Sequence, residues 1–256
     1  MDSQVFPQIN DVRGAHFLNR KLNYFLEREL ESADEQETLI TEKDWDNLII
    51  LDACRYDTYY EIVDDDKEDY IISPGSHSRE FIEETFSEGD FSDIIYITAN
   101  PHFSESWFEE SASRDIEETF FAVYKTFETD WNEKLGTTLP DPVIRDALNA
   151  EKLYPEKKKI IHFMQPHAPL AYSKKESADL SGFEGDREEE AERRYRKNLE
   201  FVLDRLDELV EEVEDKTVIT ADHGELLGEG DRYFSHPHSI DSKVLKKVPW
   251  HIVKED

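Results

Sequence analysis

The chain has 256 residues and carries 61 acidic against 30 basic side chains, a formal net charge of -31. This length suits one large α/β domain, and the acidic excess argues against nucleic acid or an anionic membrane surface as a partner, because phosphate contacts need clustered Lys and Arg. No stretch reaches the roughly 18 apolar residues of a membrane span, and the N-terminus has no apolar segment of signal-peptide length. With one cysteine, Cys54, no disulfide can form within the chain. We expect a single cytoplasmic domain over residues 1–256, not inserted in a membrane.

The acidic residues are spread along the chain between apolar positions that can form a core, so disorder does not explain them. A diffuse acidic excess is typical of a surface adapted to molar salt, where screening removes self-repulsion. We therefore interpret the source as a halophile and expect both the fold and the activity to weaken at low salt.

The first half of the chain predicts one edge helix and four strands. Apolar residues at helical spacing predict an amphipathic helix over residues 14–32, packed on the edge of the core. A strand at 48–51 is apolar on both faces, which is typical of a central parallel strand, and a helix to about residue 63 follows it. Further along, the sequence predicts a strand at 70–72, a helix from Ser78 to about Phe86, and strands at 93–98 and 120–125.

The second half continues the alternation of helices and strands. The sequence predicts a helix from Pro142 to Leu153, a strand at 159–164, a surface loop at 171–186, a long helix from about 188 to 213, a strand at 217–220 and a last apolar piece at 248–253. Strands that alternate with helices imply a parallel sheet covered on both faces. We predict a three-layer αβα sandwich with a mostly parallel central sheet.

Polar residues gather where the predicted strands end. Asp52 follows the first strand, and Asp222 and His223 follow the strand at 217–220. Ligands bind at the carboxyl ends of the strands in open α/β sheets, so these three side chains should meet at one edge. A carboxylate and an imidazole suit a divalent metal such as Zn²⁺ or Mn²⁺. We hypothesise that Asp52, Asp222 and His223 are metal ligands.

A hydroxyl from a third loop would complete such a site. A serine beside a metal loses its proton more easily and becomes a nucleophile at neutral pH. Ser78 is the preferred candidate because it begins a predicted helix, whose N-terminus favours an oxyanion, and Ser76 in the same loop is the alternative. Both serines could instead be caps of the loop. His162 points into a predicted strand, and we expect it to be structural.

Four segments resemble one protein family in their order and approximate spacing. They are Leu-Asp-Ala-Cys-Arg-Tyr-Asp at 51–57, Met-Gln-Pro-His-Ala-Pro at 164–169, Ala-Asp-His-Gly-Glu-Leu-Leu-Gly-Glu at 221–229, and Ser-His-Pro at 235–237 with Val-Pro-Trp at 248–250. Together they resemble the sulfatase-like branch of the alkaline phosphatase superfamily, in the form expected of halophilic archaea.

This resemblance implies roles for several residues. Asp52, Asp222 and His223 would bind a divalent metal (Zn²⁺, Mn²⁺, Mg²⁺ or Ca²⁺), and the loop at 76–78 would supply the nucleophile. His167 and His236 match positions that bind substrate oxygens or a second metal, and His102 is a further candidate for substrate binding. A second complete Asp-His-His set is not evident, so we expect one firm metal site.

The chain also departs from the family. True sulfatases mature a cysteine in a Cys-x-Pro-x-Arg pattern, whereas this chain has Cys54-Arg55-Tyr56-Asp57-Thr58, in another loop and without that proline. A serine nucleophile fits phosphate esters better than sulfate esters. The family's smaller C-terminal subdomain is not evident, so we expect a pocket that is open or is closed by a second copy of the chain.

These observations leave three hypotheses open. The first is a metal-dependent hydrolase or transferase that acts on anionic phosphate (less readily sulfate) esters through a covalent serine intermediate. The second is a catalytically inactive relative that binds an anionic glycan or nucleotide, which the missing formylglycine motif motivates. The third is a scaffold protein in which the metal is only structural. Loss of turnover with retained ligand binding in Ser78→Ala and Ser76→Ala would separate the first from the second.

Overall fold

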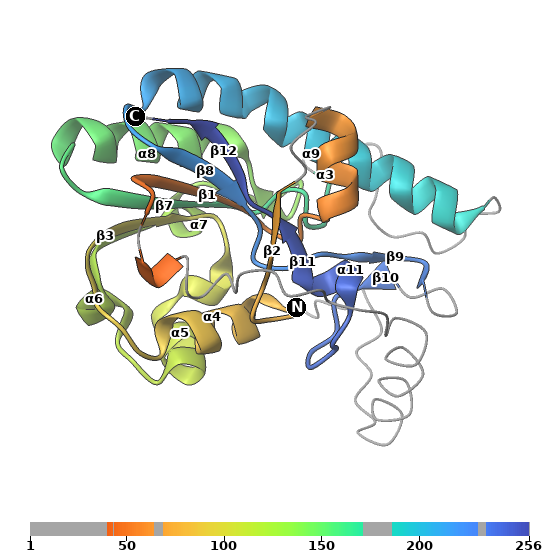
Figure 1. Ribbon diagram of the computed structural model, residues 1–256, viewed down its shortest axis with the longest axis horizontal. Helices are drawn as coiled ribbons and strands as arrows, with labels where there is room; N and C mark the ends of the chain where they lie inside the picture. Colours follow the sequence, from red (N-terminus) through yellow and green to blue (C-terminus); the bar gives the residue numbers. More distant parts are fainter. Residues whose placement is uncertain (1–39, 43, 64–68, 171–185, 230–233, 256) are drawn as a thin grey trace.

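The computed structural model describes residues 40–42, 44–63, 69–170, 186–229 and 234–255, and these form a sheet between two layers of helices (Figure 1). The sheet has six strands in the order β12-β8-β1-β7-β3-β4. In chain order the strands are β1 (Asn47–Leu51), β3 (Phe91–Thr98), β4 (Phe120–Lys125), β7 (Lys158–Phe163), β8 (Thr217–Thr220) and β12 (His251–Lys254). All neighbours are parallel except β12, which runs antiparallel to β8. The predicted αβα sandwich is confirmed.

β1 shows why the sheet is covered on both faces. All its residues are buried, and their side chains alternate between the faces. Leu48 and Ile50 join the core on one face, and Ile49 and Leu51 join the core on the other. A strand buried on both sides needs neighbours on both edges, and β7 and β8 supply them.

Two groups of helices form the outer layers, as Figure 1 shows. One layer contains α3 (Tyr56–Val63), α8 (Pro140–Leu153) and α9 (Arg187–Glu212), whose apolar stripes pack on the face of Ile49. The other contains α4 (Ser78–Phe86), α5 (Glu105–Ala112) and α6 (Ile116–Thr119), which pack on the face of Leu48. Short elements complete the described chain: η1 (Pro101–Phe103), α7 (Thr126–Thr129), β5 (Trp131–Asn132), β6 (Thr137–Thr138), β9 (Leu226–Leu227), β10 (Phe234–Ser235) and α11 (Lys243–Lys246).

Two predicted strands have partners that the sequence does not reveal. The strand at 70–72 is β2 (Tyr70–Ile72), but it lies outside the central sheet and pairs antiparallel with β11 (Lys247–Pro249). The apolar piece at 248–253 divides into β11 and β12, because Trp250 between them donates its N–H to the carbonyl of Asp69. Only β12 therefore joins the sheet.

Some predictions fall on residues outside the described ranges. These are the helix at 14–32 and nearly all of the surface loop at 171–186. The single-domain organisation stays a prediction. Among the described residues, no helix is both long enough and apolar enough to cross a membrane.

Candidate metal site

Two turns carry the first carboxylates to the carboxyl edge of the sheet. Asp52 follows β1 directly, and Asp222 follows the neighbouring strand β8. Ala53, after Asp52, adopts φ 60°, a left-handed conformation that a residue with a Cβ takes only when its surroundings hold it. Its N–H donates to Oδ1 of Asp222 at 3.0 Å, and the N–H of His223 donates to the same oxygen at 2.9 Å. The two turns thus fix the Asp222 carboxylate and leave its Oδ2 for other partners.

Asp52, Asp222 and His162 form a buried group with unmatched polar atoms. None of the three side chains is exposed, and Nε2 of His162 lies 3.8 Å from Oδ2 of Asp52 and 3.9 Å from Oδ2 of Asp222. Within the described part of the chain, Oδ1 of Asp52, Oδ2 of Asp222 and Nε2 of His162 have no hydrogen-bond partner. A buried polar atom without a partner is costly, so three that converge are the expected signature of a cation site. The donor set therefore fits a metal ion.

His223 faces the same carboxylates through one defined ring nitrogen. Its Nδ1 lies 2.8 Å from the carbonyl oxygen of Gly224, which can only accept, so Nδ1 carries the proton. Nε2 therefore offers its lone pair, and it lies 3.5 Å from Oδ2 of Asp222 and 3.9 Å from Oδ1 of Asp52. Metal-binding histidines usually have this second hydrogen bond to an oxygen.

Ser78 lies against the group at the start of α4. Its Oγ is 3.3 Å from Nε2 of His223 and accepts a hydrogen bond of 3.1 Å from Nδ2 of Asn100. The same amide donates to Oδ2 of Asp52 at 2.6 Å. The structure therefore brings together the preferred serine, the predicted ligands Asp52, Asp222 and His223, and two residues that the sequence analysis did not assign to the site, Asn100 and His162.

Burial sets the protonation of the group. Burial and the nearby charges of Asp222 and Glu225 raise the pKa of Asp52 well above its ordinary value. Burial also raises the pKa of Asp222, but His223, His162 and the hydrogen bonds at its carboxylate outweigh that effect and leave it lowered. The pKa of His162 falls to about 4, chiefly because burial disfavours the imidazolium. At neutral pH His162 is thus neutral, and of the two carboxyls Asp52 is the one whose ionised form is disfavoured in the metal-free protein.

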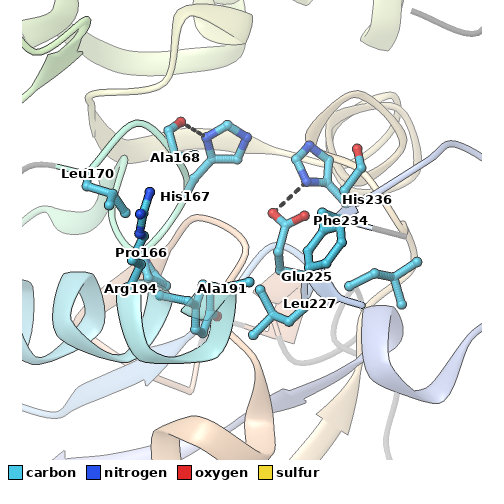
Figure 2. A pocket seen from close by; sticks show the side chains of 13 residues that line it. Pro166, His167, Ala168, Leu170, Ala191, Arg194, Glu225, Leu227, Phe234 and His236 are labelled. Carbon is cyan, nitrogen blue, oxygen red and sulfur yellow. Dashed lines mark hydrogen bonds and ion pairs between the residues drawn. The ribbon is translucent and has the colours of Figure 1, made fainter. Parts of the chain in front are cut away.

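A second group of possible metal ligands lies next to His223. His167, Glu225 and His236 lie close enough to hold an ion together, with ligand atoms within 4.8 Å of one another. The ring of His236 packs against His223 and His167, with centroids 4.5 Å and 4.9 Å apart. Nδ1 of His236 lies 2.9 Å from Oε2 of Glu225, and Nδ1 of His167 bonds to the carbonyl of Ala168 (Figure 2). Glu225 thus stands with His167 and His236 in a second group of possible ligands, whereas the single firm metal site expected from the sequence stays a prediction.

Glu225 titrates near neutrality. Burial raises its pKa, the charges of His167, His223 and Arg55 oppose the rise, and the pKa settles at about 7. The backbone beside it is also held in place: Nη1 of Arg55 donates to the carbonyl of Glu225 at 3.2 Å and to Oε1 of Glu229 at 2.6 Å. Opposite Glu225, Nδ2 of Asn198 on α9 donates to the carbonyl of Pro166 at 2.8 Å and steadies the loop of His167.

The remaining sequence candidates lie outside these two groups. Oγ of Ser76 lies 2.8 Å from Oε2 of Glu80 and 3.0 Å from the carbonyl oxygen of Pro237, either of which can accept its one proton, so its partners are not Asp52 or Asp222. The ring of His102 packs beside two other rings, with its centroid 5.4 Å from that of His77 and 4.8 Å from that of Trp107. His77 caps α4 by accepting from the N–H of Arg79 and stacks on His238 at 3.8 Å.

The residues that sequence reasoning missed gave weak signals. His162 interrupts an apolar strand, but only its register, opposite Ile50 and Thr98, puts it beside Asp52. Asn100 follows a strand, as Asp52 does, which predicts its place at this edge of the sheet but not its hydrogen bonds to Asp52 and Ser78. Glu225 stands in the same short segment as Asp222 and His223, and this closeness in sequence was the one indication that it lies near the site.

Comparison with known proteins gives a likeness of fold. Neither a family model nor a curated protein matches the sequence. Among solved structures, the soluble domain of lipooligosaccharide phosphoethanolamine transferase A from Neisseria meningitidis is similar, with a TM-score of 0.51, 13% identity, and coverage of 88% of this chain and 78% of that chain. The integral membrane protein lipooligosaccharide phosphoethanolamine transferase A (EptA) from the same organism gives a TM-score of 0.50 and 14% identity, with 88% of this chain and 49% of that chain covered. At this level of identity the likeness shows a shared fold, and it gives no support to the sulfatase-like branch that the sequence resembles.

Proposed function

We propose that this protein is a metal-dependent enzyme that transfers or hydrolyses phosphate esters, with Ser78 as the covalent nucleophile. One observation carries the proposal. Oγ of Ser78 contacts Asn100 and His223. It does so beside three buried atoms that have no hydrogen-bond partner among the described residues, one each from Asp52, Asp222 and His162. The fold shared with a protein named for phosphoethanolamine transfer supports phosphoryl over sulfuryl chemistry. It also favours turnover over the inactive binding protein.

The first group has the donors for a divalent metal. Asp52, Asp222 and His223 would hold it, with Ser78 and His162 beside them. A mixed set of carboxylate and imidazole suits Zn²⁺ or Mn²⁺ better than Ca²⁺, which prefers oxygen alone. When bound, such an ion would neutralise the carboxylates, lower the pKa of the serine hydroxyl and polarise a phosphoryl oxygen.

The chain's own residues then define the transfer. Asn100 donates to Oγ of Ser78, which keeps a lone pair of that oxygen engaged and directs the O–H away from the amide. Oγ gives up its proton to solvent, and the bond from Oγ to phosphorus then forms as the bond from phosphorus to the ester oxygen breaks. The leaving oxygen needs a proton, and the pair of Glu225 and His236 can supply one, because a carboxyl with a pKa of about 7 still holds its proton in half of the molecules at that pH.

A trapping experiment tests this proposal. The protein in molar KCl is incubated with Mn²⁺ or Zn²⁺ and phenyl phosphate, quenched in acid, and digested for mass spectrometry. We expect one added phosphoryl group on the peptide of Ser78, absent from Ser78→Ala and from Asp222→Ala. Ser76→Ala is the matched control and should keep both the adduct and turnover.

The result that would overturn the proposal is also defined. Full turnover in Ser78→Ala, or an adduct at Ser76, would remove Ser78 as the nucleophile. Retained binding of inorganic phosphate without turnover of any phosphate or sulfate ester, in protein shown to contain metal, would favour the inactive binding protein.

A further inference from the structure

A cavity of about 210 Å³ opens beside the second histidine group. The cavity's walls come from three places: the loop after β7, the N-terminal half of α9, and the β9–β10 hairpin. Figure 2 shows His167, Glu225 and His236 at one end and apolar side chains at the other. The apolar lining includes Leu170, Ala191, Leu226, Leu227 and Phe234.

Two polar side chains of α9 in this lining, Tyr195 and Arg194, have partners within the protein. The hydroxyl of Tyr195 donates to the carbonyl of Ala53 at 2.6 Å and accepts from the N–H of Arg55 at 2.7 Å. Arg194 forms an ion pair with Glu190, with Nε 2.6 Å from Oε1. A ligand in the cavity would therefore gain from apolar contact, at roughly 25 cal/mol per Å² buried, and not from a charge.

A chain of contacts connects the cavity with the reacting groups. Ser78 contacts His223, the ring of His223 packs on His236, and His236 borders the cavity together with His167. In-line displacement puts the leaving oxygen on the side of phosphorus opposite the nucleophile. A leaving oxygen that takes its proton from the pair of Glu225 and His236 carries its organic group to the edge of the cavity, because both residues line it.

We propose that the cavity binds the apolar organic group of the alcohol that leaves from, or accepts, the phosphoryl group. This inference rests on the proposed function and names its substrate class: phosphate esters of aryl or short alkyl alcohols. An apolar cavity of about 150 Å³ accommodates benzene, so this one has room for a phenyl ring or a chain of about six carbons.

The same position serves the second half of the reaction. An incoming alcohol approaches the phosphoserine from where the first alcohol left, so its organic group occupies the same cavity. Its oxygen bonds to phosphorus, the bond to Oγ of Ser78 breaks, and its proton returns to the pair of His236 and Glu225. Because the alcohol gains apolar contact there and water does not, the cavity favours transfer over hydrolysis.

The test fills the cavity and compares esters. Ala191→Trp places a large side chain in it, and Leu153→Trp places the same side chain at an exposed position at the end of α8. For each protein, kcat/KM is measured with methyl, phenyl and hexyl phosphate. We expect Ala191→Trp to lower the ratio of phenyl to methyl phosphate at least about tenfold, and Leu153→Trp to leave this ratio unchanged. The hexyl ester separates an aryl from an alkyl preference.

Binding is measured separately from turnover, by ligand-observed NMR with phenol and 1-hexanol. Binding to the wild type that Ala191→Trp abolishes supports the cavity even if no ester is turned over, in which case only the proposed function fails. An unchanged ester ratio, or no binding of either alcohol to the wild type, overturns the inference. If Ala191→Trp does not fold, Phe234→Ala replaces it and should shift the preference from phenyl toward 1-naphthyl phosphate.

Discussion

The side-chain amide of Asn100 donates a hydrogen bond of 2.6 Å to Oδ2 of Asp52. The same nitrogen lies 3.1 Å from Oγ of Ser78, so one amide connects a carboxylate after β1 with a hydroxyl at the start of α4. Asn100 is itself fixed, because its Oδ1 accepts from the N–H of His102 at 2.8 Å. It therefore positions both Asp52, the proposed metal ligand, and Ser78, the proposed nucleophile.

Asn100→Ala should lower the affinity for metal and the yield of phosphoserine together. Loss of a residue that orients a ligand typically costs about 10- to 100-fold in metal affinity or activity. Metal affinity is measured by titration against a fluorescent chelator, and the adduct by mass spectrometry. Asn149→Ala, at an exposed position on α8, is the control. Unchanged metal affinity and an unchanged adduct in Asn100→Ala would contradict this role.

Elements with a strong local period were predicted well from the sequence. The helix expected at about 188–213 is α9 at Arg187–Glu212, and the strand at 120–125 is β4. Their apolar spacing is a local property, so the sequence alone carries it. The ends of β1 and β8 could also be predicted from the sequence, and with them the positions of Asp52 and Asp222 at the edge of the sheet.

What the sequence could not show depends on contacts between distant segments. β2 reads as a strand of the sheet, but its partner β11 is far away in the chain. His162 was expected to be structural because a strand residue's surroundings depend on register and not on its neighbours in sequence. Glu225 forms a hydrogen bond with His236, which follows β10 and is separated from Glu225 by the length of the hairpin.

Metal binding should release protons. The raised pKa of Asp52, caused by burial and by the charges of Asp222 and Glu225, leaves this carboxyl protonated over a wide range in the metal-free protein. A metal needs the ionised form, so its binding displaces the proton and its affinity rises with pH up to the pKa of Asp52. Calorimetric titrations in buffers of different ionisation enthalpy measure the protons released. Binding enthalpies that do not depend on the buffer would contradict this prediction.

The same carboxyl should make the metal-free protein less stable at high pH. A carboxyl whose pKa is raised on folding holds its proton more tightly in the folded state than in the unfolded state, so stability falls as pH rises from about 4 toward the folded pKa. Asp52→Asn removes this titration. Without metal, we expect the unfolding midpoint of Asp52→Asn to exceed that of the wild type increasingly as pH rises above about 4, and metal to reverse the order. Parallel pH profiles of the two proteins would rule this out.

Gly224 should tolerate no side chain. A Cβ at this position would lie 2.0 Å from the main-chain oxygen of Val244, and the N–H of Gly224 donates to the carbonyl of Leu245 at 2.7 Å, so backbone would have to move. Gly224→Ala should cost more than about 3 kcal/mol of unfolding free energy in urea denaturation.

Gly136→Ala is the matched control for this substitution. Gly136 has φ +71°, but a Cβ there would lie 3.5 Å from Cγ of Pro169, which is ordinary contact. Its cost should be about 1–2 kcal/mol, the strain of a left-handed alanine. Similar losses in the two variants would show that the approach to Val244 is not what requires a glycine at 224.

Stability should rise steeply with salt, because 61 acids against 30 bases leave a net charge of -31 to repel itself. The Debye length falls from about 10 Å at 0.1 M to about 3 Å at 1 M, so molar KCl removes most of this repulsion. Glu208, Glu211 and Glu212 are exposed near the C-terminus of α9, where negative charge also opposes the helix dipole. The triple variant E208Q/E211Q/E212Q should therefore raise the thermal unfolding midpoint more in dilute buffer than in molar KCl.

A second variant tests the same effect in the other helical layer. Glu83→Gln together with Glu84→Gln removes two charges near the C-terminus of α4 and should show the same dependence on salt. A midpoint that does not depend on KCl, or equal gains at low and high salt, would mean that self-repulsion does not limit the stability of this fold.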